Sequence, residues 1–87
     1  MRPALAFTWS LEDIEARLID ACEEVFVLKG LTGDDNLFHL GSHPQSTVRV
    51  LLAMEVRLGV TLDEDICDGD DGRIASVAAR ILARLYP

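Results

Sequence analysis

The sequence predicts an all-α domain, and two observations support this. Three stretches carry apolar residues at i, i+3 and i+4 spacing, which is the signature of an amphipathic helix. No segment alternates between apolar and polar residues over a useful length, so strands are not expected. The chain has 87 residues, and we expect one domain over residues 1–87, with residues 1–8 as a short flexible arm. The result is a helical bundle of three main helices, a short third helix and a long first loop.

The first helix is predicted over residues 11–27. Ser10 is a suitable N-cap, and Glu12 and Asp13 follow in the first turn, where carboxylates favour the helix dipole. Gly30 is expected to stop the helix. The predicted apolar face consists of Leu11, Ile14, Leu18, Cys22 and Val25.

A long connection, residues 29–43, leads to the second helix. Its apolar residues are expected to pin it to the core, with Phe38 and Leu40 buried against the first and second helices. The second helix is predicted to begin near residues 42–44. Ser42 and Gln45 have the spacing of a capping box, and Pro44 suits a first turn.

Gly59 is expected to end the second helix, with Arg49, Glu55 and Arg57 exposed. Its exposed side is close to neutral or slightly basic, unlike the rest of the chain. Its predicted buried stripe consists of Val48, Leu51, Leu52, Met54 and Leu58.

Two further helices complete the bundle. A short third helix is predicted around residues 63–68, with Ile66 pointing inward. The last helix follows the turn "DGDDG", and Arg80 and Arg84 near its end complement the helix dipole. The predicted apolar face of the last helix consists of Ile74, Val77, Ala78, Ile81, Leu82 and Leu85.

Composition excludes several classes of partner. The formal net charge of −7 disfavours nucleic acid, because phosphate binding needs clustered Lys and Arg. No apolar run approaches the length that spans a bilayer, and no signal peptide is apparent, so no membrane association and a cytoplasmic location are expected. Cys22 lies on an apolar helical face and is predicted to be a buried thiol.

The sequence predicts neither a metal site nor an active site. The acids between Asp63 and Asp71 fail the register of a calcium-binding loop, since Cys67 occupies a ligand position. His39 and His43 are four residues apart, but no third zinc ligand is apparent. No nucleotide-binding or nucleophile motif occurs. We therefore expect a protein that is not an enzyme and binds no metal.

Residues 34–60, "DDNLFHLGSHPQSTVRVLLAMEVRLGV", resemble the central part of acyl and peptidyl carrier proteins. The order of elements agrees over nearly the whole chain, and His43 and Arg49 are closer to peptidyl carriers. The residues that match the family pattern are Asp35, Asn36, Phe38, Leu40, Gly41, His43, Val48, Glu55 and Gly59. In this register Pro44 stands where the family has its serine.

The resemblance implies an acyl-carrier-like four-helix bundle. In the family, the serine hydroxyl forms a phosphodiester with 4′-phosphopantetheine, whose thiol carries an acyl or aminoacyl group. Pro44 has no hydroxyl, so no cofactor is expected at this position. The resemblance then implies a carrier-like domain that acts through protein contacts in nonribosomal peptide or polyketide biosynthesis. Its partners would be adenylation, condensation or synthase enzymes.

The contact surface implied by the family comprises the end of the long loop, the second helix and the short third helix. The residues expected on it are His43, Val48, Arg49, Leu52, Arg57 and Ile66.

Two alternatives stay open. The protein could be a working carrier with phosphopantetheine on Ser46 or Ser42, each two residues from Pro44. Ser42 is also suited to cap the helix, and Ser46 to be an exposed polar residue within it. The second alternative is a small helical regulatory or partner module unrelated to biosynthesis.

Overall fold

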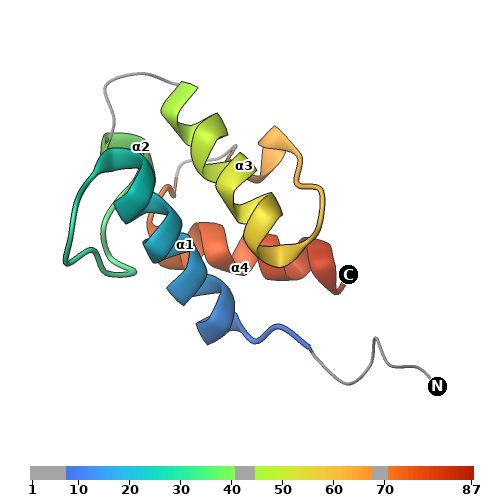
Figure 1. Ribbon diagram of the computed structural model, residues 1–87. Helices are drawn as coiled ribbons and strands as arrows, with labels where there is room; N and C mark the ends of the chain where they lie inside the picture. Colours follow the sequence, from blue (N-terminus) through green and yellow to red (C-terminus); the bar gives the residue numbers. More distant parts are fainter. Residues whose placement is uncertain (1–7, 41–44, 68–70) are drawn as a thin grey trace.

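The computed structural model describes residues 8–40, 45–67 and 71–87, and these fold into packed helices (Figure 1). The elements are α1 (Leu11–Phe26), α2 (Leu37–Leu40), α3 (Gln45–Leu58), the 3₁₀ helix η2 (Glu64–Cys67) and α4 (Ile74–Leu85). Over the described ranges no strand forms, and one isolated bridge joins Asn36 to Arg73. The all-α prediction is therefore confirmed.

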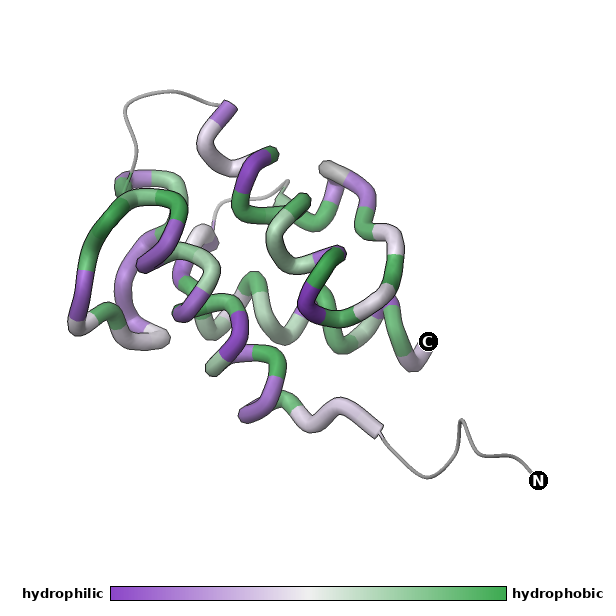
Figure 2. Tube along the Cα trace, viewed as in Figure 1, coloured by the Kyte–Doolittle hydropathy of each residue, from purple (hydrophilic) through white to green (hydrophobic). Residues whose placement is uncertain are grey.

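The core lies where α1 packs against both α3 and α4, and η2 closes it between α3 and α4. Figure 2 shows hydrophobic residues recurring along α1, α3 and α4, as the periodicity predicts. The most deeply buried large side chains include Ile14, Leu18, Leu37, Met54 and Ile66.

The α1 helix begins as predicted and ends differently. Ser10 and Asp13 form a capping box, in which the Ser10 hydroxyl accepts from the Asp13 N–H at 3.1 Å and the Asp13 carboxylate accepts from the Ser10 N–H at 3.2 Å. The helix ends before Gly30, because Val27 adopts the left-handed conformation that reverses the chain. Leu11 is exposed, so it does not belong to the core-facing side.

The rotation of α3 also differs from the prediction. Its buried side consists of Val50, Leu51, Met54 and Leu58. Leu52 was predicted to be buried but is exposed, and Val48 is half-buried. Leu51 and Leu52 are adjacent in the sequence, so their side chains leave the helix about 100° apart and only one of them can face the core. Gly59, with φ +69°, ends the helix as predicted.

The long connection packs against the core, as predicted. Leu37 is fully buried. Phe38 and Leu40 were predicted to be buried against the first and second helices, but they are only half-buried against the core residues. Residues 37–40 form the short helix α2, which was not predicted. The Asn36 side chain caps it by accepting from the Phe38 N–H at 2.9 Å.

Backbone hydrogen bonds tie this connection to the start of α4. The Ile74 N–H donates to the Asp35 carbonyl at 2.9 Å, and the Ala75 N–H donates to the Gly33 carbonyl at 3.0 Å. In return, the Leu37 N–H donates to the Gly72 carbonyl at 2.7 Å. We call these three bonds the loop–α4 strap. The first two satisfy N–H groups at the start of α4, where the N-cap residue Arg73 supplies no side-chain hydrogen bond.

The two ends of the described fold also meet. The Trp9 N–H donates to the Tyr86 hydroxyl at 2.7 Å, and the Arg17 guanidinium lies 4.8 Å from the centre of the Trp9 ring. The entry to α1 and the end of α4 are therefore held together at one side of the bundle.

We predict that Val27→Gly stabilises the fold. Val27 is 87% exposed and has φ 55°, which costs a β-branched residue about 1 kcal/mol or more. Glycine removes this cost, although it adds entropy to the unfolded chain. We expect Tm to rise by roughly 4 °C, measured by circular dichroism. The matched control is Val56→Gly, because Val56 is 83% exposed but lies within a helix, so its replacement should lower Tm. Equal effects of the two substitutions would contradict the strain at Val27.

We predict that Gly72→Ala destabilises the fold by roughly 1–3 kcal/mol. A Cβ atom at Gly72 would overlap the ring of Phe38 and the Asn36 amide oxygen, and would disturb the strap. Urea unfolding measures the loss. At Gly33 a Cβ atom would meet mainly the Glu15 carboxylate, which ends a flexible side chain that can turn away. Gly33→Ala should therefore cost less than Gly72→Ala, and the reverse order would exclude this account of the packing.

Candidate functional site

One side of α3 is exposed along its length. Gln45, Arg49, Leu52 and Val56 follow one another at intervals of four, three and four residues, so their side chains form a line on the helix. Leu52 is 56% exposed and Val56 is 83% exposed, while the opposite side of the same helix lies in the core. We call these four residues the outer face of α3. Val56 was not among the predicted contact residues, although its place one turn beyond Leu52 could have indicated it.

The predicted contact residues divide between this face and the interior. Arg49 and Leu52 lie on the outer face, and Val48 is half-buried beside it. Ile66 is 1% exposed, so its assignment to a contact surface is wrong. The short helix η2 packs against α3 and α4 and directs Ile66 into the core between them.

Arg57 was expected to be exposed, but it joins α3 to α1. Its side chain is 22% exposed, and its guanidinium lies 3.4 Å from the Glu24 carboxylate and 3.7 Å from that of Asp20. It also donates to the Ala53 carbonyl at 3.3 Å. The Arg57 charge is therefore largely used within the molecule.

The serine region is described only in part. Ser42, His43 and Pro44 lie outside the described residues. Ser46 lies in the first turn of α3 and is half-buried, whereas the sequence suggested an exposed position. Ser46 lies one turn before Val50, which is fully buried, so the Ser46 hydroxyl does not lie on the outer face.

Glu55 has a structural use that the sequence did not predict. Its carboxylate accepts from the Leu62 N–H at 2.6 Å, and its carbonyl accepts from the Gly59 N–H at 2.8 Å. Glu55 is half-buried, and it is the only acid within α3. The outer face of α3 consequently carries one cation and no acid.

Arginines of α4 hold η2 and Asp71. Arg80 donates to the carbonyl oxygens of Ile66, at 3.0 Å, and of Asp71. Arg84 forms a two-pronged ion pair with Asp65, at 2.9 and 2.7 Å. Both arginines were predicted to complement the helix dipole. Their side chains bind η2 and Asp71, which precede α4 in the sequence.

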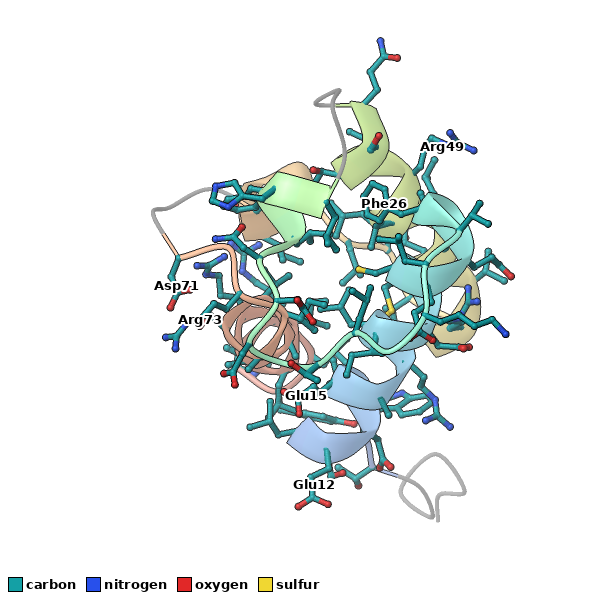
Figure 3. All side chains as sticks on the ribbon, turned by 90° about the vertical axis from the view of Figure 1, so that its left-hand side faces the viewer. Glu12, Glu15, Phe26, Arg49, Asp71 and Arg73 are labelled. Atoms are coloured by element: carbon teal, nitrogen blue, oxygen red, sulfur yellow. The ribbon has the colours of Figure 1, made fainter. Side chains whose placement is uncertain are left out.

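Carboxylates near these arginines have shifted pKa values. The guanidinium of Arg73 and then the hydroxyl of Ser76 donate to Asp71 and hold its pKa well below the usual range. Arg84 likewise lowers the pKa of Asp65 through its hydrogen bonds. Figure 3 labels Asp71 and Arg73, which lie together beside α4.

The chemistry of the other candidate groups is limited. Cys22 is fully buried, as predicted, and burial raises the pKa of its thiol to about 12, which disfavours a reactive thiolate. Within the described ranges, no three or more His, Cys, Asp or Glu side chains gather as metal ligands. In the same ranges, no helix has both the length and the apolar character needed to cross a bilayer.

We predict that acid weakens the fold through Asp71. Because its pKa is lowered in the folded protein, Asp71 contributes stability above the usual carboxyl pKa, and this is lost as the pH falls towards the folded value. The urea midpoint should therefore fall between about pH 6 and about pH 3, and should fall less in Asp71→Asn. Arg73→Met should reduce the acid sensitivity in the same way, because it removes the main cause of the shift. An undiminished loss in both variants would place the acid sensitivity elsewhere.

Comparison with protein-family models, with curated proteins and with solved structures finds no match to this chain.

Proposed function

We propose that this protein is a carrier-protein-like domain of a nonribosomal peptide or polyketide type of pathway, and that it acts by binding partner proteins. The observation that carries the proposal is the outer face of α3. A helix in a small bundle normally turns aliphatic side chains inward, yet Leu52 and Val56 are more than half exposed here. Adenylation, condensation or synthase enzymes are the proposed partners.

The positions that match the carrier pattern support the family assignment through the roles they have here. Asn36 caps α2, and Asp35 supplies a carbonyl to the loop–α4 strap. Glu55 fixes the turn after α3, and Gly59 allows that turn with its positive φ. A shared fold would need these residues whether or not a prosthetic group is attached.

The attachment position does not fit the prosthetic group. Pro44 offers no hydroxyl, so no phosphodiester with 4′-phosphopantetheine can form there. The alternative on Ser46 would use a half-buried hydroxyl, away from the outer face of α3. The proposed function therefore depends on protein contacts and includes no step through phosphopantetheine.

We expect no mass gain when the protein is incubated with coenzyme A and a phosphopantetheinyl transferase of broad specificity. Intact-protein mass spectrometry measures the result. The matched variant is Pro44→Ser, which restores the hydroxyl at the family's position and should gain the mass of one phosphopantetheine arm.

The contrary outcomes separate the alternatives. A mass gain in the unaltered protein that is lost in Ser46→Ala or Ser42→Ala would establish a working carrier. If Pro44→Ser folds but is not modified, the carrier assignment falls and a regulatory module unrelated to biosynthesis is favoured.

A further inference from the structure

The lysine and arginine side chains of the described residues divide into two groups. Five are engaged within the molecule by ring, carbonyl or carboxylate contacts: Arg17, Arg57, Arg73, Arg80 and Arg84. The other two are Lys29 and Arg49, which are exposed and make no ion pair with any described residue. These are the cations that remain available to a partner.

Arg49 is unusual because of its surroundings. The protein has 15 Asp and Glu residues against 8 Lys and Arg residues, so an exposed arginine would ordinarily have an acid nearby. The acid of its own helix, Glu55, is bound to the Leu62 N–H. Arg49 therefore stands beside Leu52 and Val56 on a face that is apolar and positive, on a molecule that is negative as a whole.

The end of α1, by which we mean residues 27–29 directly after the helix, has the same character, and the exposed acid of the last helical turn, Glu24, is paired with Arg57. Val27 and Leu28 are exposed aliphatic residues, and Lys29 follows them. Arg57 holds α1 and α3 together through Asp20 and Glu24, and the two helices run in opposite directions (Figure 1). Figure 3 shows Arg49 and Phe26, the last residue of α1, on the same side of the molecule.

We propose that the outer face of α3, together with the end of α1, binds an acidic amphipathic helix of a partner protein. This inference rests on the proposed function and specifies its partner. Aliphatic side chains of the partner would cover Leu52 and Val56, and a carboxylate would pair with Arg49. Arg49 and Val56 are about 10 Å apart along the helix axis, which matches two turns of a partner helix.

Charge selects this occupant over two others. A second copy meeting this face through its own would offer Arg49 no carboxylate, because the outer face of α3 carries no acid. An anionic membrane is bound through clusters of about four to eight Lys and Arg residues, whereas this surface offers Arg49 and Lys29. An acidic amphipathic partner satisfies both the cation and the exposed aliphatic residues.

The test uses two synthetic peptides and the full chain. One peptide is an amphipathic helix of about 15 residues, with leucines on one side and glutamates beside them. The second has lysine in place of every glutamate. Titration into ¹⁵N-labelled protein gives the affinity and the position of binding. We expect the glutamate peptide to bind more tightly, with amide shifts at residues 49–56 and 27–29.

Variants then show which side chains of the protein bind the peptides. Arg49→Glu should lower the affinity for the glutamate peptide by at least about tenfold and raise the affinity for the lysine peptide. Leu52→Ser should lower the affinity for both peptides, because it removes an apolar contact. The matched controls are Ala83→Glu, which adds a negative charge at an exposed position of α4, and Leu11→Ser, which removes an exposed leucine of α1. Both controls should leave binding unchanged.

Several results would overturn the inference. These are equal binding of the two peptides, shifts confined to other residues, or no binding at about 1 mM peptide. A dimer that dissociates in Leu52→Ser would show that a second copy occupies the face. Co-sedimentation of the unaltered protein with anionic vesicles that is lost in Arg49→Glu would indicate a membrane surface instead.

The peptide titration tests the choice of partner, and the phosphopantetheine experiment tests the carrier assignment, so a negative result in one leaves the other claim standing. If the glutamate peptide does not bind but Pro44→Ser is modified, the carrier assignment stands and this choice of partner is wrong. If the peptide binds but Pro44→Ser is not modified, the interaction surface stands and the carrier assignment is wrong.

Discussion

The loop–α4 strap is the constraint on which the arrangement of the helices depends. A connection of this length loses much conformational entropy when it is fixed, and such loops inside small domains need their own contacts. Here the carbonyls of Gly33 and Asp35 supply the acceptors that the start of α4 lacks, and the Gly72 carbonyl accepts from Leu37. The strap thus fixes the loop, buries Leu37 and sets the position of α4 at once. It also explains why residue 72 has no side chain, since the ring of Phe38 occupies that space.

Several acidic side chains fix turns by accepting hydrogen bonds from backbone N–H groups. The Glu23 carboxylate accepts from the Leu31 N–H, the Glu55 carboxylate from the Leu62 N–H, and the Asp35 carboxylate from the Thr32 N–H. Each of these bonds fixes a turn that follows or precedes a helix, and bonds to a charged acceptor are stronger than neutral ones. These three of the 15 acids are therefore committed to loop structure. The exposed aliphatic residues and the arginine on the outer face of α3 have no comparable role in the fold.

The sequence predicted the existence and type of the main helices well, because local signals define them. The capping box at Ser10, the turn at Gly59 and the apolar spacing of the last helix all act within a few residues. The rotation of α3 could not be predicted in the same way. The run "VRVLLAMEV" carries aliphatic residues on every side, so only the positions of α1 and η2 decide that Leu51 is buried and Leu52 exposed.

Contacts between distant segments were also beyond the sequence. Arg57 was predicted to be exposed, because its pairing with Asp20 and Glu24 depends on how α1 packs against α3. Arg49 and Leu52 of the outer face of α3 were predicted to contact partner proteins. Val56 was identified only by its exposure in the structure. The family resemblance placed Ile66 on the contact surface, whereas the pattern of the short helix predicted that Ile66 points inward. The second prediction is correct.

The hydrogen bonds from Arg80 and Arg84 to Asp65, Ile66 and Asp71 have a consequence for how the chain folds during synthesis. Both arginines belong to α4, which is the last helix of the domain and also the helix that the strap requires. Until α4 has left the ribosome, η2 lacks its bonds to Arg80 and Arg84. The loop–α4 strap also lacks the N–H groups of Ile74 and Ala75, and the side of α1 that packs against α4 is uncovered. The domain is therefore expected to fold only after translation of its last helix, rather than element by element as the chain emerges.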